Sequence, residues 1–148
     1  DPSKYDPRSK ETADHSLPYV LAVALVDRQV TPRQLEMDRI MDPVVRAQLP
    51  KVKVVADAEI EAAFPALQRA RVEVETTSGQ RLGTTLDFPR GDPRNPLTED
   101  EILGKMRALA EGVAEEDEVD RMASAVRRAE EMESASGLAS ALVVGVRG

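Results

Sequence analysis

The chain has 148 residues, enough for one domain, with 41% apolar positions, 32% charged positions and a net charge of −7. It has no cysteine and one histidine, which excludes disulfide scaffolds, thiolate nucleophiles, zinc fingers and histidine-rich metal sites. Residues 98–133 carry 12 acidic and 5 basic side chains while the rest of the chain is balanced, so nucleic acids and anionic membranes are unsuitable partners.

The first part of the chain predicts a loop followed by a buried helix. Residues 1–12 contain two Asp-Pro pairs, which keep the backbone extended and turn-rich. Ser16 is a suitable N-cap for a helix that has Pro18 in its first turn and ends near Asp27. Its run over residues 17–26 is apolar on every face, which is typical of a buried helix. Because a membrane span needs roughly 20 apolar residues, we expect no span here, and we do not expect the polar residues 1–16 to be a signal peptide.

Two short helices should follow. Thr31 and Gln34 have the spacing of a capping box, which predicts a helix beginning after Thr31. Asp42 precedes a proline and should cap a further helix that continues through about Leu49. Pro50 is expected to end that helix.

The middle of the chain predicts a small sheet. Residues 51–60 and 70–77 are rich in β-branched side chains, and the second stretch alternates between charged and uncharged positions, as half-buried strands do. Ser78 and Gly79 then separate it from a third stretch at 80–88, which predicts a tight two-residue hairpin turn.

The last third of the chain predicts a stiff loop and then helices. Residues 88–96 are rich in proline and glycine, and Thr98 with Glu101 forms a second capping box. Apolar residues at helical spacing then predict helices over residues 98–113, 119–129 and 135–144, with a frayed tail at 145–148. Together the elements predict an α+β fold: a buried N-terminal helix and short helices, a small antiparallel sheet with a hairpin, and C-terminal helices.

One segment gathers reactive side chains. Asp14, His15, Ser16 and Tyr19 lie within six residues, directly before and inside the helix that should be buried. Residue chemistry alone favours a structural interpretation, in which Ser16 caps the helix and the rings are buried. The other interpretation is a polar site at the mouth of the core.

The same segment is similar to a known family. KYDPRSKETADHSLPYVLAVALVD resembles a stretch of the MmgE/PrpD family, the group of 2-methylcitrate dehydratases and cis-aconitate decarboxylases. LVDRQVTPRQLE, KVKVVADAEIEAAFP and RVEVETTSGQRLGTTLDFPRGDPRNPLTEDEILGKMRALA resemble later passages of the family, in the same order. Arg28 stands where the family commonly has glycine, and Leu35 and Met106 stand where phenylalanine is common.

The resemblance implies a cofactor-independent lyase, a dehydratase of 2-methylcitrate-like tricarboxylates in propionate metabolism, expected to be cytoplasmic and homodimeric. It implies that residues 1–95 are part of an α+β lid domain. Residues 96–148 would be helices that pack on an N-terminal helical domain outside this sequence. The substrate would be a small polycarboxylate, and the chain alone would be inactive.

The resemblance also implies site residues. Tyr19 is similar to a lid tyrosine that faces the active-site cleft, so Tyr19 and His15 are the predicted catalytic residues and Ser16 the predicted substrate-binding residue. No cofactor and no metal are implied, and Arg8 and Lys10 are the only cations near the motif in sequence. Two alternatives stay open: an isomerase, epimerase or decarboxylase of small polycarboxylates on the same fold, and a non-catalytic domain that binds a helical partner subunit.

Overall fold

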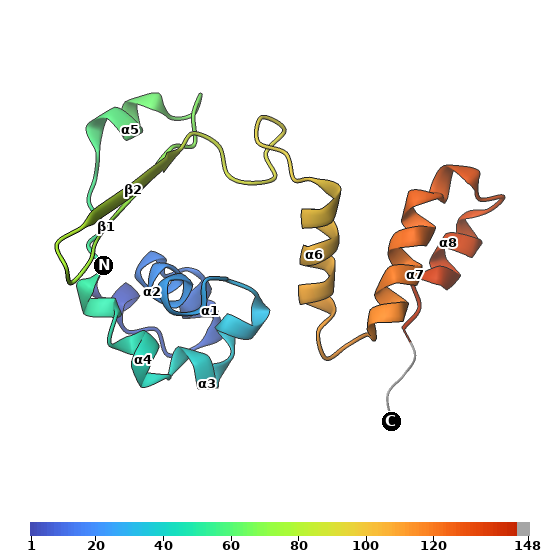
Figure 1. Cartoon of the computed structure of the whole chain (residues 1–148), viewed down its shortest axis with the longest axis horizontal. Coiled ribbons are helices and arrows are strands. Elements are labelled where there is room, and N and C mark those ends of the chain that lie inside the picture. The colour runs from blue at the N-terminus through green and yellow to red at the C-terminus, as the bar shows by residue number, and fades with distance from the viewer. Residues whose placement is uncertain (145–148) are drawn as a thin grey trace. The chain divides into compact units, whose positions relative to one another are not determined.

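The structure, a computed structural model, describes residues 1–144, and the chain divides into two compact units, Asp1–Pro96 and Leu97–Gly148 (Figure 1). The content is α+β, as predicted: helices, a two-stranded antiparallel sheet, then further helices. The assignment of these parts to a lid domain and to helices of a larger protein stays a prediction. The tail at 145–148, for which fraying is predicted, lies outside the described residues.

The first unit consists of short helices up to residue 63, followed by the hairpin and the proline-rich loop. Its elements are η1 (Pro2–Tyr5), α1 (Lys10–Asp14), α2 (Leu17–Asp27), η2 (Pro32–Leu35), α3 (Met37–Ile40), α4 (Pro43–Arg46), η3 (Leu49–Lys51), α5 (Ala58–Ala63), β1 (Ala70–Glu75) and β2 (Arg81–Leu86). Elements labelled η are 3-10 helices.

Helix α2 is the centre of the first unit. Ser16 caps it as predicted, because its side-chain oxygen accepts a hydrogen bond of 3.1 Å from the Tyr19 amide. The helix is buried on one side, where Tyr19 and Val23 are fully buried, while Leu17 and Leu25 on the other side are more than half exposed. The helix therefore packs on one side only within this chain. The core around it consists of Ala13, Tyr19, Ala22, Val23, Ile40, Val45 and Leu49, with Val26 and Leu35 packed against them.

Arg28, the C-cap of α2, adopts the left-handed conformation, with φ 60° and ψ 15°. A side chain is disfavoured there by about 1 kcal/mol, whereas glycine reaches it without a Cβ clash. We therefore expect Arg28→Gly to raise the free energy of unfolding by about 1 kcal/mol in urea denaturation of the chain. Arg28→Ala keeps the Cβ and should give no such gain. An equal gain in both variants would show that the stabilisation comes from removing the arginine side chain and not from relieving the strained backbone.

Two loop and helix boundaries differ from expectation. Residues 1–12 are not one extended loop, because Ser9 and Thr12 cap each other's backbone and start α1. The helix after Asp42 ends at Arg46 instead of Leu49. Pro50 lies inside η3, near its start, where the amide hydrogen it lacks would have no helical partner.

The predicted strand at 51–60 is wrong. Residues 52–57 form no strand, and the Asp57 side chain accepts from the amides of Glu59 and Ile60, which starts α5 instead. A β-branched run becomes a strand only when a neighbouring strand satisfies its backbone, and the described sheet holds only β1 and β2.

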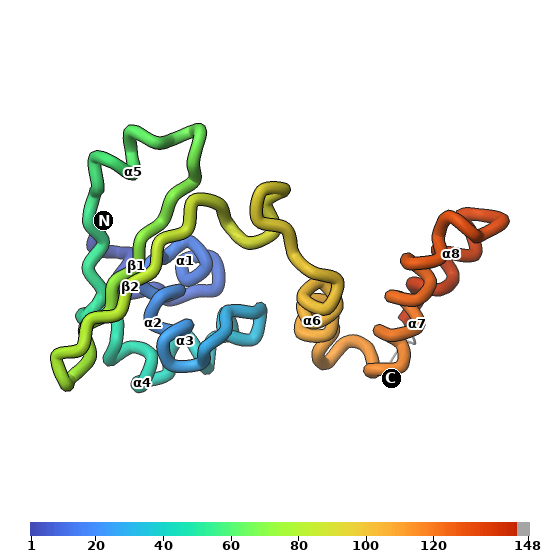
Figure 2. The backbone as a smooth tube through the Cα atoms, turned by 45° about the horizontal axis from the view of Figure 1, so that its top comes forward, coloured from blue at the N-terminus to red at the C-terminus, as the bar shows by residue number. Residues whose placement is uncertain are grey.

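The hairpin forms where it was predicted, with shorter strands and a wider turn. β1 pairs with β2 in antiparallel register from Ala70 opposite Leu86 to Glu75 opposite Arg81, and Figure 2 shows the two strands side by side. The Gly79 amide donates to the Thr76 carbonyl at 2.9 Å and Gly79 has φ 82°. The turn is therefore a three-residue type with glycine in the left-handed position, not a two-residue one.

The proline-rich loop after β2 is ordered by its own side chains. Asn95 donates to the Phe88 carbonyl at 3.0 Å, and the Arg94 guanidinium lies 3.8 Å from the centre of the Phe88 ring. Arg94 also pairs with Asp92, and this hydrogen bond lowers the pKa of Asp92 to about 2. The prediction of a stiff loop at 88–96 is thus consistent with a network that fixes both of its ends.

The second unit consists of short helices around a small core. Thr98 and Glu101 form the predicted capping box, and Arg107 on the first helix pairs with Asp120 on the next at 2.9 Å. Val119, Met122 and Ala125 are the buried apolar residues. The elements are α6 (Glu99–Ala110), α7 (Glu116–Arg127), η4 (Ala129–Glu131) and α8 (Ala135–Ala141). No helix in the described part of the chain has both the length and the apolar character needed to cross a membrane.

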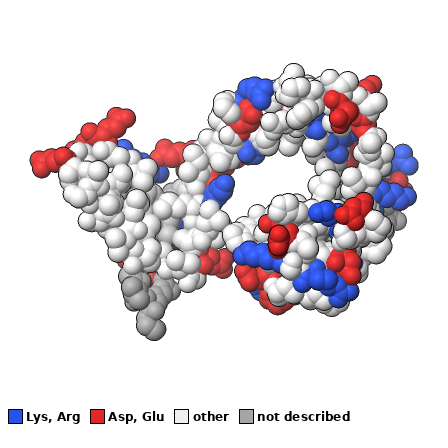
Figure 3. Space-filling view, turned by 180° about the vertical axis from the view of Figure 1, so that it is seen from behind, with Lys and Arg blue, Asp and Glu red and all other residues white. Residues whose placement is uncertain are grey.

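Many large apolar side chains are exposed in both units, which predicts self-association of the chain. On the face shown in Figure 3, the part that carries α7 and α8 has a broad area without charged atoms. We expect the weight-average mass in sedimentation to rise with concentration and a hydrophobic dye to bind. A monomer at all concentrations without dye binding would contradict this. The exposed side chains include Leu17, Leu25, Val44, Leu82, Leu86, Ile102, Leu109, Val113, Val126 and Val143.

Candidate functional site

The predicted site residues lie at the junction of two helices. α1 ends at Asp14, His15 is its C-cap, and Ser16 is the N-cap of α2. The junction is a single sharp turn because Ser16 donates its amide to the Ala13 carbonyl and then begins a new helix. Figure 1 shows α1 beside α2, so the backbone of this segment is held by the helical core.

His15 is the exposed member of the set. Its side chain is 71% exposed, and Nδ1 donates to the Glu11 carbonyl at 3.0 Å and to the Asp14 carboxylate. The Glu11 carbonyl, followed by the Asp14 carboxylate, raises the pKa of His15 above its ordinary value. These contacts hold the proton on Nδ1 and leave Nε2 for a ligand, the arrangement expected of a general acid or a carboxylate-binding group.

The raised pKa can be tested directly because the chain has one histidine. We expect Asp14→Asn to lower the midpoint of the His15 imidazole titration measured by NMR, since the charged partner of the imidazolium is lost. The pair stabilises the fold below pH 6.5, and this stabilisation is lost as pH rises through the raised pKa. Asp100→Asn removes a carboxylate in the second unit and serves as the matched control. An unchanged midpoint in Asp14→Asn would show that Asp14 has no part in the shift.

Tyr19 and Ser16 are buried and their hydroxyl groups are already bonded. The Tyr19 hydroxyl donates to the Gln34 carbonyl at 2.5 Å, and the Ser16 hydroxyl donates to the Lys4 carbonyl. Both residues are 0% exposed, and burial raises the pKa of Tyr19. This geometry gives both side chains a role in packing the segment; their predicted catalytic and substrate-binding roles stay predictions.

An ionic network, which the sequence did not reveal, lies next to Tyr19. Arg39 pairs with Asp27 and with Asp42, and Gln34 donates from its amide to Asp27 at 3.0 Å. The Arg39 guanidinium lowers the pKa of Asp27. The network ties the end of α2 to η2 and α3, and so fixes the carbonyl that accepts from Tyr19. Its partners are up to 12 positions apart, which local spacing does not reveal.

The two cations that the sequence placed near the motif are already paired. Arg8 contacts Asp6 at 2.9 Å, and Lys10 contacts Glu36 at 3.6 Å. Both pairs are exposed and therefore weak, yet they place a carboxylate beside each cation. Arg46 pairs with Asp6 as well, so this one carboxylate lies beside two arginines, while Lys10 is compensated by Glu36.

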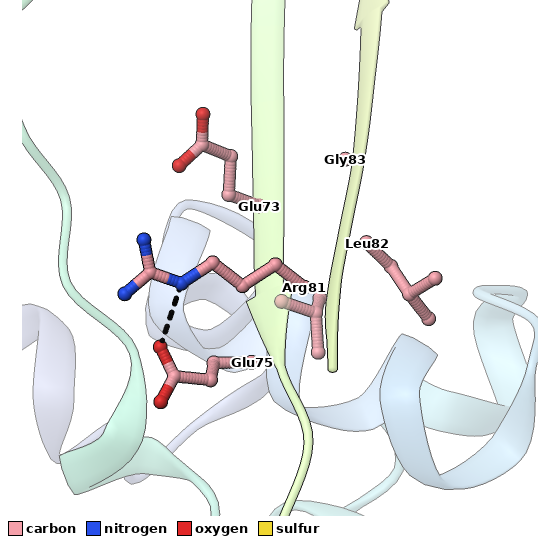
Figure 4. Close-up of a pocket in the computed structure, with 6 residues that line it drawn as sticks. Glu73, Glu75, Arg81, Leu82 and Gly83 are labelled. Carbon is pink, nitrogen blue, oxygen red and sulfur yellow. Dashed lines mark hydrogen bonds and ion pairs between the residues drawn. The ribbon is translucent and has the colours of Figure 1, made fainter. Parts of the chain in front are cut away.

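The hairpin carries a separate open hollow of about 550 Å³. Figure 4 shows Glu73, Glu75 and Arg81 pointing to one side of the hairpin and Leu82 to the other. Arg81 pairs with Glu75 at 3.1 Å, so the charged side has one carboxylate in excess. Such a surface repels polycarboxylates. Among residues 1–144 no group of three or more histidine, cysteine or acidic side chains is placed to hold a metal ion.

Comparisons with known proteins bear on this segment. A family model described as the MmgE/PrpD C-terminal domain matches residues 1–131. Similar curated proteins include cis-aconitate decarboxylases from Mus musculus, Homo sapiens and Aspergillus terreus. The mouse protein is 27% identical over 132 residues, 89% of this chain, and the human protein 28% over 136 residues, 92% of it. The fungal protein is 31% identical over 115 residues, 76% of this chain.

The match covers a limited part of those relatives. It spans 27% of the mouse protein, 28% of the human protein and 23% of the fungal protein. The chain therefore spans about a quarter of the length of these curated relatives.

Proposed function

The chain belongs to the MmgE/PrpD family, whose C-terminal domain it matches, and from this membership we propose that it is part of a lyase acting on a small polycarboxylate. The observation that carries the proposal is the similarity over 76 to 92% of the chain to cis-aconitate decarboxylases of mammals and a fungus. It supports decarboxylation of a tricarboxylate more directly than dehydration of 2-methylcitrate, which the sequence alone had favoured.

The chemistry requires positive charge and a proton donor. When carbon dioxide leaves a polycarboxylate, the electron pair of the broken bond stays on carbon, and cationic groups stabilise the charge before a proton arrives. We assign the donor role in this chain to His15, because its Nε2 is exposed and Asp14 favours the protonated ring. Tyr19 and Ser16 then act by fixing the backbone that carries His15.

The rest of the machinery is assigned to parts of the protein outside this chain. A helical domain or subunit, and a second copy of the protein, are the predicted partners. The exposed apolar residues of both units and the quarter-length coverage of the relatives support this part of the proposal. The alternatives are an isomerase or epimerase on the same fold and a non-catalytic domain bound to a helical subunit.

The test is an assay of the whole protein with defined substrates. Purified full-length protein should release carbon dioxide from cis-aconitate, and His15→Gln should lower kcat by about 100-fold or more, the usual contribution of a positioned acid. Loss of water from 2-methylcitrate without decarboxylation of cis-aconitate would make the protein a dehydratase. Turnover of neither substrate would support the non-catalytic alternative.

A further inference from the structure

A residue outside the predicted site is tied to it by a partly buried hydrogen bond. The Ser16 hydroxyl donates to the backbone carbonyl of Lys4, 12 positions earlier in the chain, and Ser16 is fully buried. This bond joins η1 to the start of α2. Lys4 is thereby held at the junction that carries His15, although the sequence separates the two residues by a turn and a helix.

Lys4 differs from the other cations near this junction in having no carboxylate partner. Arg8 and Lys10 are paired with Asp6 and Glu36. Within residues 1–144 the Lys4 ammonium forms no hydrogen bond or ion pair, and its side chain is only partly exposed. An ammonium without a carboxylate partner is available to bind an incoming anion.

His15 supplies a second group at the same place. Its Nδ1 is occupied by the Glu11 carbonyl and the Asp14 carboxylate, so Nε2 is the nitrogen left for a ligand. The Lys4 ammonium is near enough to lower the pKa of His15, while the Glu11 carbonyl and Asp14 raise it. These are the charged and polar groups from η1 and α1 that act on the ring.

We infer that Lys4 is a substrate-binding residue, and that its ammonium holds one carboxylate of the polycarboxylate substrate beside His15, the proposed proton donor. The ammonium donates a charge-assisted hydrogen bond to a carboxylate oxygen, and Nε2 of His15 stays available for proton transfer. The inference rests on the proposed function for the identity of the substrate. It gives the Ser16 hydroxyl a purpose beyond capping, because its bond to the Lys4 carbonyl fixes the backbone from which the lysine side chain extends.

The experiment compares lysine variants of the whole protein. Lys4→Met should raise KM for cis-aconitate about tenfold and leave kcat within about twofold, because the charge is lost while the backbone carbonyl that accepts from Ser16 remains. Lys4→Arg should recover most of the affinity. Lys53→Met is the matched control, because Lys53 is exposed and forms no hydrogen bond or ion pair within residues 1–144. The KM of this variant for cis-aconitate should equal that of the wild type.

A binding measurement separates this inference from the proposed function. Tricarballylate, an unreactive tricarboxylate, should shift the His15 imidazole signal in NMR of the 148-residue chain, and Lys4→Met should weaken this response about tenfold. An active wild-type protein whose KM is the same in Lys4→Met overturns the inference and leaves the proposed function in place. An inactive wild-type protein overturns the proposed function, and the tricarballylate titration then decides alone whether Lys4 holds a carboxylate beside His15.

Discussion

Tyr19→Ala is expected to lower the free energy of unfolding by about 3–5 kcal/mol, the usual cost of removing a large buried aromatic side chain. Tyr19 is 0% exposed at the centre of the α2 core, and its hydroxyl donates to the Gln34 carbonyl. Since small domains are stable by about 5–15 kcal/mol, this variant should lose a large fraction of its stability, measured as a lower midpoint in urea denaturation. Leu25→Ala, on the exposed face of the same helix, should change stability by less than about 1 kcal/mol.

Tyr19→Phe separates packing from chemistry at the same position. It keeps the ring but leaves the Gln34 carbonyl without its donor, so we expect a loss of about 1–2 kcal/mol in stability. In the whole protein, kcat should stay within about threefold of wild type, because the hydroxyl is bonded to the backbone. A 100-fold fall in kcat without a comparable fall in melting temperature would instead establish the catalytic role predicted for Tyr19.

Arg39→Met is expected to lower the free energy of unfolding by about 2 kcal/mol at pH 7. Removing one partner of a buried ion pair costs roughly 3–5 kcal/mol, and the smaller figure follows because a fifth of the Arg39 side chain is exposed. Asp27 and Asp42 would be left as partly buried carboxylates without their cation. Urea denaturation of the variant and the wild-type chain measures this difference.

The Arg39 effect should depend on pH in a defined direction. Arg39 lowers the pKa of Asp27 in the folded chain. The pair therefore stabilises the fold at pH values above 3.8, the pKa of Asp27 in the unfolded chain, and this stabilisation is lost as the pH falls through the lower pKa of the folded chain. The difference between variant and wild type should therefore be smaller at pH 3 than at pH 7. Adding Asp27→Asn to Arg39→Met should cost less than the sum of the single changes. Arg81→Met, whose side chain is 85% exposed, should leave the urea midpoint unchanged. A loss of stability in Arg39→Met that is the same at pH 3 and pH 7 would show that Arg39 stabilises the fold by packing and not by its charge.

The elements predicted correctly are those set by neighbouring residues. The Ser16 cap, the capping boxes at Thr31 and Thr98, and the hairpin around Gly79 all depend on groups within four positions of one another. The predicted strand at 51–60 and the predicted helix end at Pro50 are wrong because neither is decided by neighbouring residues alone. A strand needs a partner from elsewhere in the chain, and a proline near a helix start does not stop it.

The sequence by itself determined the family, the α+β content and the segment that carries the site, because motif order and local capping are properties of the linear chain. Only the tertiary structure decided how the polar groups of that segment are used. The Tyr19 hydroxyl is bonded to Gln34, and Lys4 is held at the His15 junction by Ser16. These pairings join residues 12 to 15 positions apart, and such residues meet only when packing of the helices brings their backbones together.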